Sequence, residues 1–232
     1  RAVGECSLRE FIRPIFVIAW KDIMLELRTK DIMVSALIFA LMVIVIFNFA
    51  LNITPATVEY LAPGILWLAF AFAGVLAMGR AFIAEGDKGS LDGLLLCPVS
   101  RDAIFFGKMI SMFIFMVVIE SLVLPIFVVL FNFDSISFNL IGIIFLGTLG
   151  FATVGTLFSA IAFNLRSREI MLPLLFFPVV TPIIIGVVEA SSGVITDTVN
   201  IIGIGRWVGL IVVFDAIFLV VCPWAFGVAM EE

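Results

Sequence analysis

The chain contains no histidine among its 232 residues. Histidine is the commonest metal ligand and the only side chain whose ordinary titration lies near neutral pH. Its absence argues against a zinc site and against a nucleophile–base pair of the usual kind. The loop Gly-x-x-x-x-Gly-Lys-Ser/Thr, which cradles nucleotide phosphates, is also missing. Both absences argue against an enzyme, and against ATP binding by this chain in that manner.

Charged residues are scarce as well. They make up only 13% of the chain, whereas 63% of the residues are hydrophobic and the mean hydropathy is +1.30. Soluble domains contain about 25% charged residues, so this composition indicates an integral membrane protein. We expect no cleavable signal, because the first residues carry several charges and the first hydrophobic run is too long for a signal-peptide core.

The long hydrophobic runs predict an all-α integral membrane protein, with a single transmembrane permease domain over residues 1–232. A span needs about 20 apolar residues to cross a bilayer. Six runs meet this length and predict spans at about 32–51, 61–84, 104–131, 140–163, 170–188 and 207–230. The fifth contains Pro173, Pro178 and Pro182, so we do not expect an uninterrupted straight helix there. The stretch from Glu189 to Arg206 could hold a short external helix or a re-entrant turn.

A helix with an apolar stripe is predicted before the first span, at about residues 8–28. Ser7-x-x-Glu10 fits a capping box at its start. The stripe consists of Leu8, Ile12, Ile15, Ala19, Ile23 and Leu27. Because a membrane span follows at once, this pattern favours a helix lying along the bilayer surface over a helix packed in a core.

Two rows of small residues predict close helix packing. Ala69, Ala73, Ala77 and Ala81 recur every fourth residue in the second span. The fourth span carries Thr148, Ala152, Thr156 and Ser159 or Ala160 in a similar row. Small side chains let neighbouring helices approach closely in a membrane, so packing is the first interpretation and a substrate path the second.

The basic residues predict the topology. With six spans, nearly all of them fall on one side: Arg1, Arg9, Arg13, Lys21, Arg28, Lys30, Arg80, Lys88, Arg101, Lys108, Arg166 and Arg168. Only Arg206 falls on the other side. The positive-inside rule then places both termini in the cytoplasm. We expect a multi-pass protein of the inner (cytoplasmic) membrane. Cys6 and Cys97 would face the cytoplasm and Cys222 the inner half of the last span, so we expect no disulfide.

The segment 85–103 is the longest interruption rich in both charges and turn residues. Ser90 can cap a short helix that presents Leu91, Leu94 and Leu95 on one face, and Pro98 ends it. Ser100 can cap the next helix, which begins near Arg101. A short amphipathic helix between two spans suits a cytoplasmic surface on which another protein pushes. An ordinary polar loop is equally compatible with this spacing of polar and apolar residues.

Two carboxylates lie inside predicted spans, Glu120 in the third and Asp215 in the sixth. A charge at mid-membrane costs about 2.5–3.5 kcal/mol on insertion scales, so each requires an explanation. Both could face a polar cavity or a subunit interface on a substrate route. Alternatively, each could be protonated or hydrogen-bonded to a neighbouring helix and fix packing. The two interpretations are balanced for Glu120, and packing is favoured for Asp215.

Several motifs carry a resemblance to a known family. One run of residues resembles the segment between the second and third spans of ABC-2 type transporter permeases. It reads Gly-Ser-Leu-Asp-Gly-Leu-Leu-Leu-Cys-Pro-Val-Ser-Arg, ends at Arg101 and is followed by Gly107-Lys108. Four further segments are similar to a narrower branch of these permeases. They are Ala62-Pro-Gly-Ile-Leu-Trp67, Gly79-Arg-Ala-Phe82, the stretch from Pro173 to Pro182 and the last span from Trp207 to Asp215. That branch is the haem exporter permease B subunit of cytochrome c maturation.

The resemblance implies six spans and a separate ABC ATPase subunit that binds ATP and couples through Leu91, Leu94, Leu95, Pro98 and Arg101. It also implies a permease dimer or partner membrane subunits, a haem chaperone and membrane lipid as partners, and no nucleic acid. Haem is then the candidate substrate rather than a cofactor of this chain. The missing histidine argues against tight axial ligation of haem here, with Met or Tyr as the remaining ligands. The alternatives are an ABC-2 permease for a lipid, polysaccharide or drug, and a non-transporting scaffold that docks the ATPase.

Overall fold

The computed structural model describes residues 2–51, 55–86, 99–131, 137–163, 168–195 and 201–229. All regular elements in these ranges are α-helices. Their bounds are α1 Ala2–Thr29, α2 Asp31–Ala50, α3 Pro55–Gly86, α5 Arg101–Phe131, α6 Phe138–Phe163, α7 Arg168–Ile195 and α8 Ile201–Ala229. The all-helical prediction is therefore confirmed for the described part of the chain.

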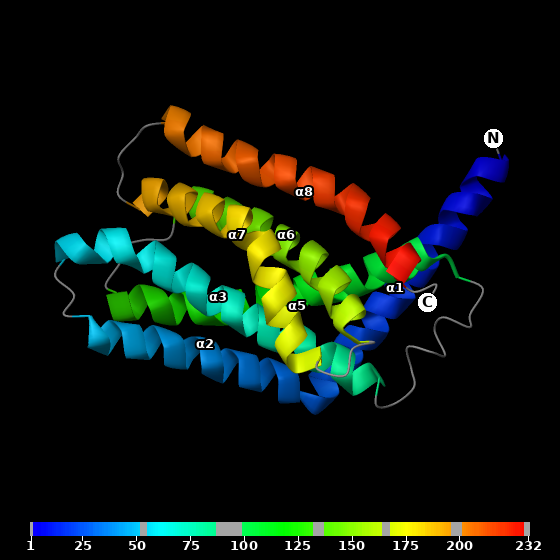
Figure 1. Cartoon of the computed structure of the whole chain (residues 1–232), viewed down its shortest axis with the longest axis horizontal. Coiled ribbons are helices and arrows are strands. Elements are labelled where there is room, and N and C mark those ends of the chain that lie inside the picture. Colours follow the sequence, from blue (N-terminus) through cyan, green and yellow to red (C-terminus); the bar gives the residue numbers. More distant parts are fainter. Residues whose placement is uncertain are drawn as a thin grey trace.

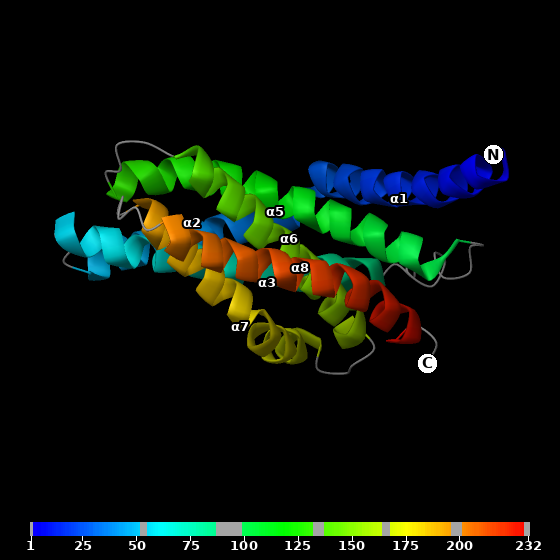
Figure 2. The same ribbon diagram turned by 90° about the horizontal axis from the view of Figure 1, so that it is seen from above.

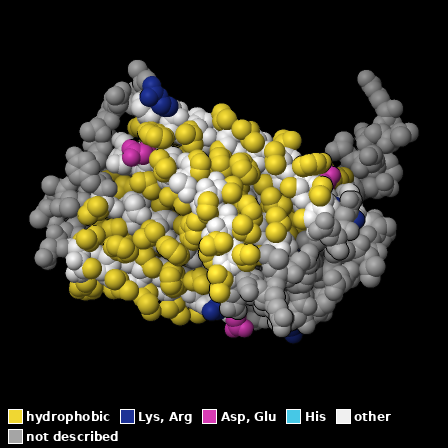
Figure 3. Space-filling view, in the orientation of Figure 1, with side chains coloured by type: hydrophobic (Ala, Val, Ile, Leu, Met, Phe, Trp, Pro, Cys, Tyr) yellow, Lys and Arg dark blue, Asp and Glu magenta, His cyan; other side chains and the backbone are white. Residues whose placement is uncertain are grey.

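Six of the described helices are long and apolar enough to cross a membrane, over residues 31–50, 61–81, 101–131, 138–162, 170–195 and 203–229. The chain is thus an all-α integral membrane protein with six candidate spans, as the hydrophobic runs predict. The physical reason is that a helix satisfies all its backbone hydrogen bonds internally, which an apolar solvent requires. Figure 3 shows one face as a broad hydrophobic surface with charged side chains at its margins.

The spans form a bundle around α6. This helix packs against α3, α5, α7 and α8, and 72% of its hydrophobic stretch is buried, compared with 17% for α2 and 22% for α8. Figures 1 and 2 show that α1 begins and α8 ends at the same end of the bundle. The helix ends at 50, 131 and 195 lie at the opposite end (Figure 1). Both ends of the described chain therefore lie on one side of the bundle.

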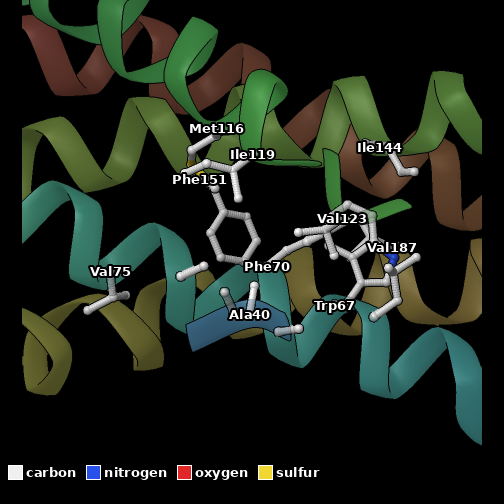
Figure 4. Packing of buried hydrophobic residues seen from close by; sticks show 14 of the residues in the cluster. Ala40, Trp67, Phe70, Val75, Met116, Ile119, Val123, Ile144, Phe151 and Val187 are labelled. Carbon is white, nitrogen blue, oxygen red and sulfur yellow. The ribbon is translucent and has the colours of Figure 1, made fainter. Parts of the chain in front are cut away.

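Small residues bring the inner helices together, as predicted. Ala69, Ala73 and Ala77 are fully buried in α3, and Thr148, Ala152, Thr156 and Ala160 are fully buried in α6. Larger side chains of neighbouring helices fill the space above glycines: Met116 lies against Gly74, and Met78 lies against Gly155. Figure 4 shows Trp67 and Phe70 of α3 packed among side chains of α5 and α6, including Val123 and Phe151.

The proline-bearing helix α7 is one helix that is not straight, which agrees with the prediction. It is continuous from Arg168 to Ile195 although Pro173, Pro178 and Pro182 lie inside it. Figure 1 shows the helix changing direction between its yellow first half and its darker second half. Proline removes a backbone donor and crowds the preceding turn, which bends a helix without ending it. The helix is therefore bent but not interrupted.

The prediction of a short external helix or re-entrant turn between Glu189 and Arg206 is wrong for the described residues. Residues 189–195 continue α7, and residues 201–206 begin α8. The serine hydroxyls in this polar stretch do not force a turn, because Ser191 is buried and its Oγ accepts a hydrogen bond from Trp67 Nε1 at 2.9 Å. A polar residue with an interhelical partner can remain inside a helix in the membrane.

The first helix, α1, spans the predicted interfacial segment, and its predicted apolar stripe is divided between the bundle and the exposed surface. Ile12 and Leu27 of the stripe are 53% and 52% exposed, whereas Ala19 is buried together with Ile18 and Glu26. Polar groups on the buried face find partners on α5 and α2, which the periodicity of apolar residues does not reveal. The exposed face is apolar, with Phe16 and Trp20 on it, and suits the membrane interface.

Candidate functional site

The first intramembrane carboxylate, Glu120, is only 3% exposed and lies between α5 and α6. Thr148 Oγ1 lies 2.7 Å from both carboxyl oxygens and 2.8 Å from Ile144 O. A hydroxyl group has one hydrogen, so Thr148 can donate to only one of these acceptors at a time. Glu120 is therefore held by a hydrogen bond to the central helix, which matches the packing interpretation of its sequence position.

The second carboxylate, Asp215, is 4% exposed and lies against Gly150 of α6. A Cβ built on Gly150 would overlap Asp215 Oδ1 from α8 and Ile183 Cδ1 from α7. Among the residues that the structure describes, neither oxygen of Asp215 has a hydrogen-bond partner. Buried polar groups almost always have one, so Asp215 is the carboxylate that packing leaves unexplained.

The structure does not bring the two carboxylates together. Glu120 meets α6 at Thr148, and Asp215 meets it at Gly150. Two residues along an α-helix correspond to a rotation of about 200° and a rise of about 3 Å. The two groups therefore lie at similar depth on nearly opposite faces of α6, and they do not line one common cavity.

Candidate ligands for haem iron or another metal are few. No group of three or more His, Cys, Asp or Glu side chains gathers anywhere in the described ranges. Met24 and Met42 are exposed, at 48% and 54%. Three other methionines are packed: Met78 and Met116 fill the space above glycines, and Met109 Sδ lies 3.4 Å from Thr153 Oγ1. These thioethers fill gaps between helices, a common role for methionine.

Of the predicted coupling residues, Arg101 is the one the structure describes. Leu91, Leu94, Leu95 and Pro98 lie outside the described residues. Arg101 begins α5 as predicted, and Ser100 caps this helix, since Ser100 Oγ lies 3.4 Å from Ala103 N. The Arg101 guanidinium donates from Nη1 to Gly227 O, at 2.9 Å, near the end of α8. Arg101 therefore ties the start of the third span to the end of the sixth.

Sequence reasoning missed a charged contact between α1 and α5. Lys108 Nζ lies 3.3 Å from Asp22 Oδ2, although 86 residues separate them in the chain. Lys108 is 5% exposed, a degree of burial that is rare for lysine. The only sequence signal was a basic residue seven positions inside a hydrophobic helix. Its partner could not be inferred, because several acidic residues lie in the N-terminal part of the chain.

Comparison with known proteins places this architecture in a family. The family model described as "CcmB protein" matches residues 13–232, from the second turn of the interfacial helix prediction to the end of the chain. The chain belongs to the CcmB family. The match includes all six candidate spans, the segment 85–103 and both intramembrane carboxylates. The resemblance inferred from the sequence motifs is thereby confirmed.

Individual CcmB relatives are similar over between 44% and 95% of their length. "Heme exporter protein B" of Bradyrhizobium diazoefficiens is 25% identical over 213 residues, which cover 91% of this chain and 95% of the relative. The protein of that name from Rhodobacter capsulatus is 28% identical over 166 residues, 71% of this chain and 76% of the relative. That of Escherichia coli K12 is 31% identical over 96 residues, 40% and 44% of the two chains.

Proposed function

We propose that this chain is the membrane permease subunit of a haem exporter that acts in cytochrome c maturation. The observation that carries the proposal is the CcmB family match over residues 13–232, supported by relatives named as haem exporter subunits. The six spans supply the membrane part, and haem is the cargo. Because the sequence has no phosphate-binding loop, a separate ATPase subunit supplies ATP hydrolysis.

Deleting the gene in its own host tests this function. We expect c-type cytochromes, detected by covalent haem staining, to disappear while non-covalently bound haem proteins stay at normal levels. Normal c-type cytochromes in the deletion strain would contradict the proposal and favour a permease for another cargo. Reconstitution of the complex in proteoliposomes then separates transport from scaffolding, because only a transporter moves haem across the bilayer when ATP is hydrolysed.

We further propose that the chain lies in the inner membrane with its termini and the segment 85–103 in the cytoplasm. The two described ends of the chain lie at one end of the bundle, and the basic residues gather on that side. In sealed cells, a membrane-impermeant maleimide is expected to label Thr57→Cys and Ser137→Cys but not Lys88→Cys. The variants are built after replacing Cys6, Cys97 and Cys222.

The Lys88→Cys variant carries its own control, since it should be labelled once the membrane is made permeable. Labelling of Lys88→Cys in intact cells, at the level of Ser137→Cys, would reverse the proposed orientation. Ser137 is a suitable reporter because its side chain is exposed immediately before α6 begins.

For the intramembrane carboxylates, the contacts favour Asp215 over Glu120 as the functional group. Glu120 has a hydrogen-bond partner on α6, whereas Asp215 has none among the described residues. A carboxyl group without a polar partner is expensive to keep in a membrane, and such groups mark functional positions. We infer that Asp215 gains a polar partner in another arrangement of α8 against α6 during the transport cycle.

The matched pair Asp215→Asn and Glu120→Gln tests this assignment. Glu120→Gln should remain within about twofold of wild type in both membrane abundance and c-type cytochromes, because its amide can still hydrogen-bond with Thr148 Oγ1. Asp215→Asn should insert normally but lower c-type cytochromes at least about tenfold. The reason is that the variant loses a charge-assisted hydrogen bond, and a loss of about 1.4 kcal/mol corresponds to a factor of ten. The opposite pattern, with only Glu120→Gln inactive, would return Asp215 to a packing role.

A further inference from the structure

The helices α1 and α5 touch at their backbones. At Gly107 of α5, a Cβ would lie 2.9 Å from Ile18 Cβ and 3.1 Å from Ile15 O of α1. Both distances are shorter than ordinary van der Waals contact, so a side chain at position 107 would push the helices apart. The ring of Phe106, the residue before Gly107, meets the ring of Phe11, one turn before Ile15, edge to face with centroids 6.5 Å apart. The close approach therefore depends on glycine at the crossing point.

A charged cluster that includes one buried ammonium lies beside this crossing. Lys108, next to Gly107, is 5% exposed, and its Nζ lies 3.3 Å from Asp22 Oδ2. Lys21 Nζ lies 3.0 Å from Asp22 Oδ1, and Ser111 Oγ lies 3.5 Å from Asp22 Oδ2. If α1 moved away from α5, the buried ammonium would lose a carboxylate partner, which is strongly unfavourable. Sliding and separation of the two helices are therefore both opposed.

At its other end, α1 is joined to the first span by one residue. Lys30 stands between α1 and α2 with φ 60°, a left-handed conformation, and its N–H donates to Glu26 O. Glu26, 7% exposed, accepts a hydrogen bond from Met33 N at 2.8 Å and so caps the start of α2. Because the connection is this short and the Glu26 side chain of α1 accepts a hydrogen bond from the first turn of α2, α2 follows any movement of α1.

These contacts form a continuous route from the start of α5 to α2. The helix α5 begins directly after the segment proposed to receive the ATPase, and it passes Lys108 two turns later. We propose that Asp22 and Lys108 are positioning residues that hold α1 and the first part of α5 together as one rigid body. A displacement delivered at the start of α5 then reaches α2 through α1. This inference rests on the proposed function, in which a separate ATPase drives the permease.

The experiment replaces the ion pair by a covalent bond. The double variant Asp22→Asn/Lys108→Met removes both charges, so neither is left buried without its partner. In the purified permease–ATPase complex in nanodiscs, we expect it to lose at least about tenfold in ATP hydrolysis while the ATPase remains bound. Adding Ile18→Cys and Gly107→Cys, in a background without the native cysteines, then allows a disulfide where the helices touch, once the two Cβ positions separate from 2.9 Å to the spacing of about 3.8 Å that a disulfide needs.

Oxidation of this cross-linked variant should restore ATP hydrolysis to within about twofold of the complex that carries the same two cysteines with Asp22 and Lys108 intact, and dithiothreitol should remove the gain. That control should have the same activity oxidised and reduced, which separates the effect of the bond from the effect of a side chain at position 107. Three results would overturn the rigid-body assignment. The disulfide could fail to restore activity, it could inhibit the chain in which Asp22 and Lys108 are intact, or the uncharged double variant could show wild-type activity. Absence of a bound ATPase from the wild-type complex would instead contradict the proposed function itself.

Discussion

Replacement of Leu95 by glutamate is expected to reduce co-purification of the ATPase subunit at least about tenfold. The sequence predicts a short helix in the segment 85–103 with Leu91, Leu94 and Leu95 on one face, and a face of this size would fit a groove on a partner protein. Burying one leucine contributes about 1.5–3 kcal/mol, and each 1.4 kcal/mol corresponds to a tenfold change in affinity. Activity should fall with docking, whereas membrane abundance should stay normal because the segment lies outside the spans.

The matched control is Leu95→Met, which keeps an apolar side chain of similar volume and should retain the ATPase. Both variants are compared by quantifying the two subunits after purification in mild detergent. Wild-type stoichiometry in Leu95→Glu would show that the leucine face is not the docking surface. The exposed apolar face of α1, with Phe16 and Trp20, would then be the next surface to mutate.

The second large effect is expected from Gly150→Val in the central helix. Any side chain at position 150 would overlap Ile183 Cδ1 on α7 and Asp215 Oδ1 on α8, so both buried side chains would have to shift. Overpacking of a tight core costs about 1–3 kcal/mol, and here two contacts are affected at once. We expect a clear fall in the thermal unfolding midpoint of the detergent-solubilised protein and in its abundance in the membrane.

Gly142→Val provides the control on the same helix. A Cβ at Gly142 has no atom within 4 Å, so this substitution tests the effect of a β-branched residue in α6 without the clash. Adding Asp215→Ala to Gly150→Val should recover part of the lost stability, because one of the two overlaps disappears. Equal behaviour of Gly150→Val and Gly142→Val would contradict the close contact between α6 and α8.

The partners of the polar residues could not be predicted from the sequence. The sequence marks Glu120 as an unusual mid-membrane group, but Thr148 as its partner follows only from the packing of α5 on α6. The same holds for Asp22 and Lys108, which lie in different helices. The sequence favours a packing role for Asp215, yet the structure shows it without a hydrogen-bond partner among the described residues. A charge in a hydrophobic run shows that a partner is needed, without showing which helix supplies it.

The sequence by itself determined the six spans, because crossing a bilayer depends on the length and hydrophobicity of each run, and both are local properties. The rows of small residues likewise identified where helices approach closely. Only the tertiary structure decided that α6 is central, that α7 stays continuous through three prolines and which face of α1 is buried. The physical reason is that spans in lipid are apolar on all sides, so periodicity does not distinguish a face that meets lipid from one that meets another helix.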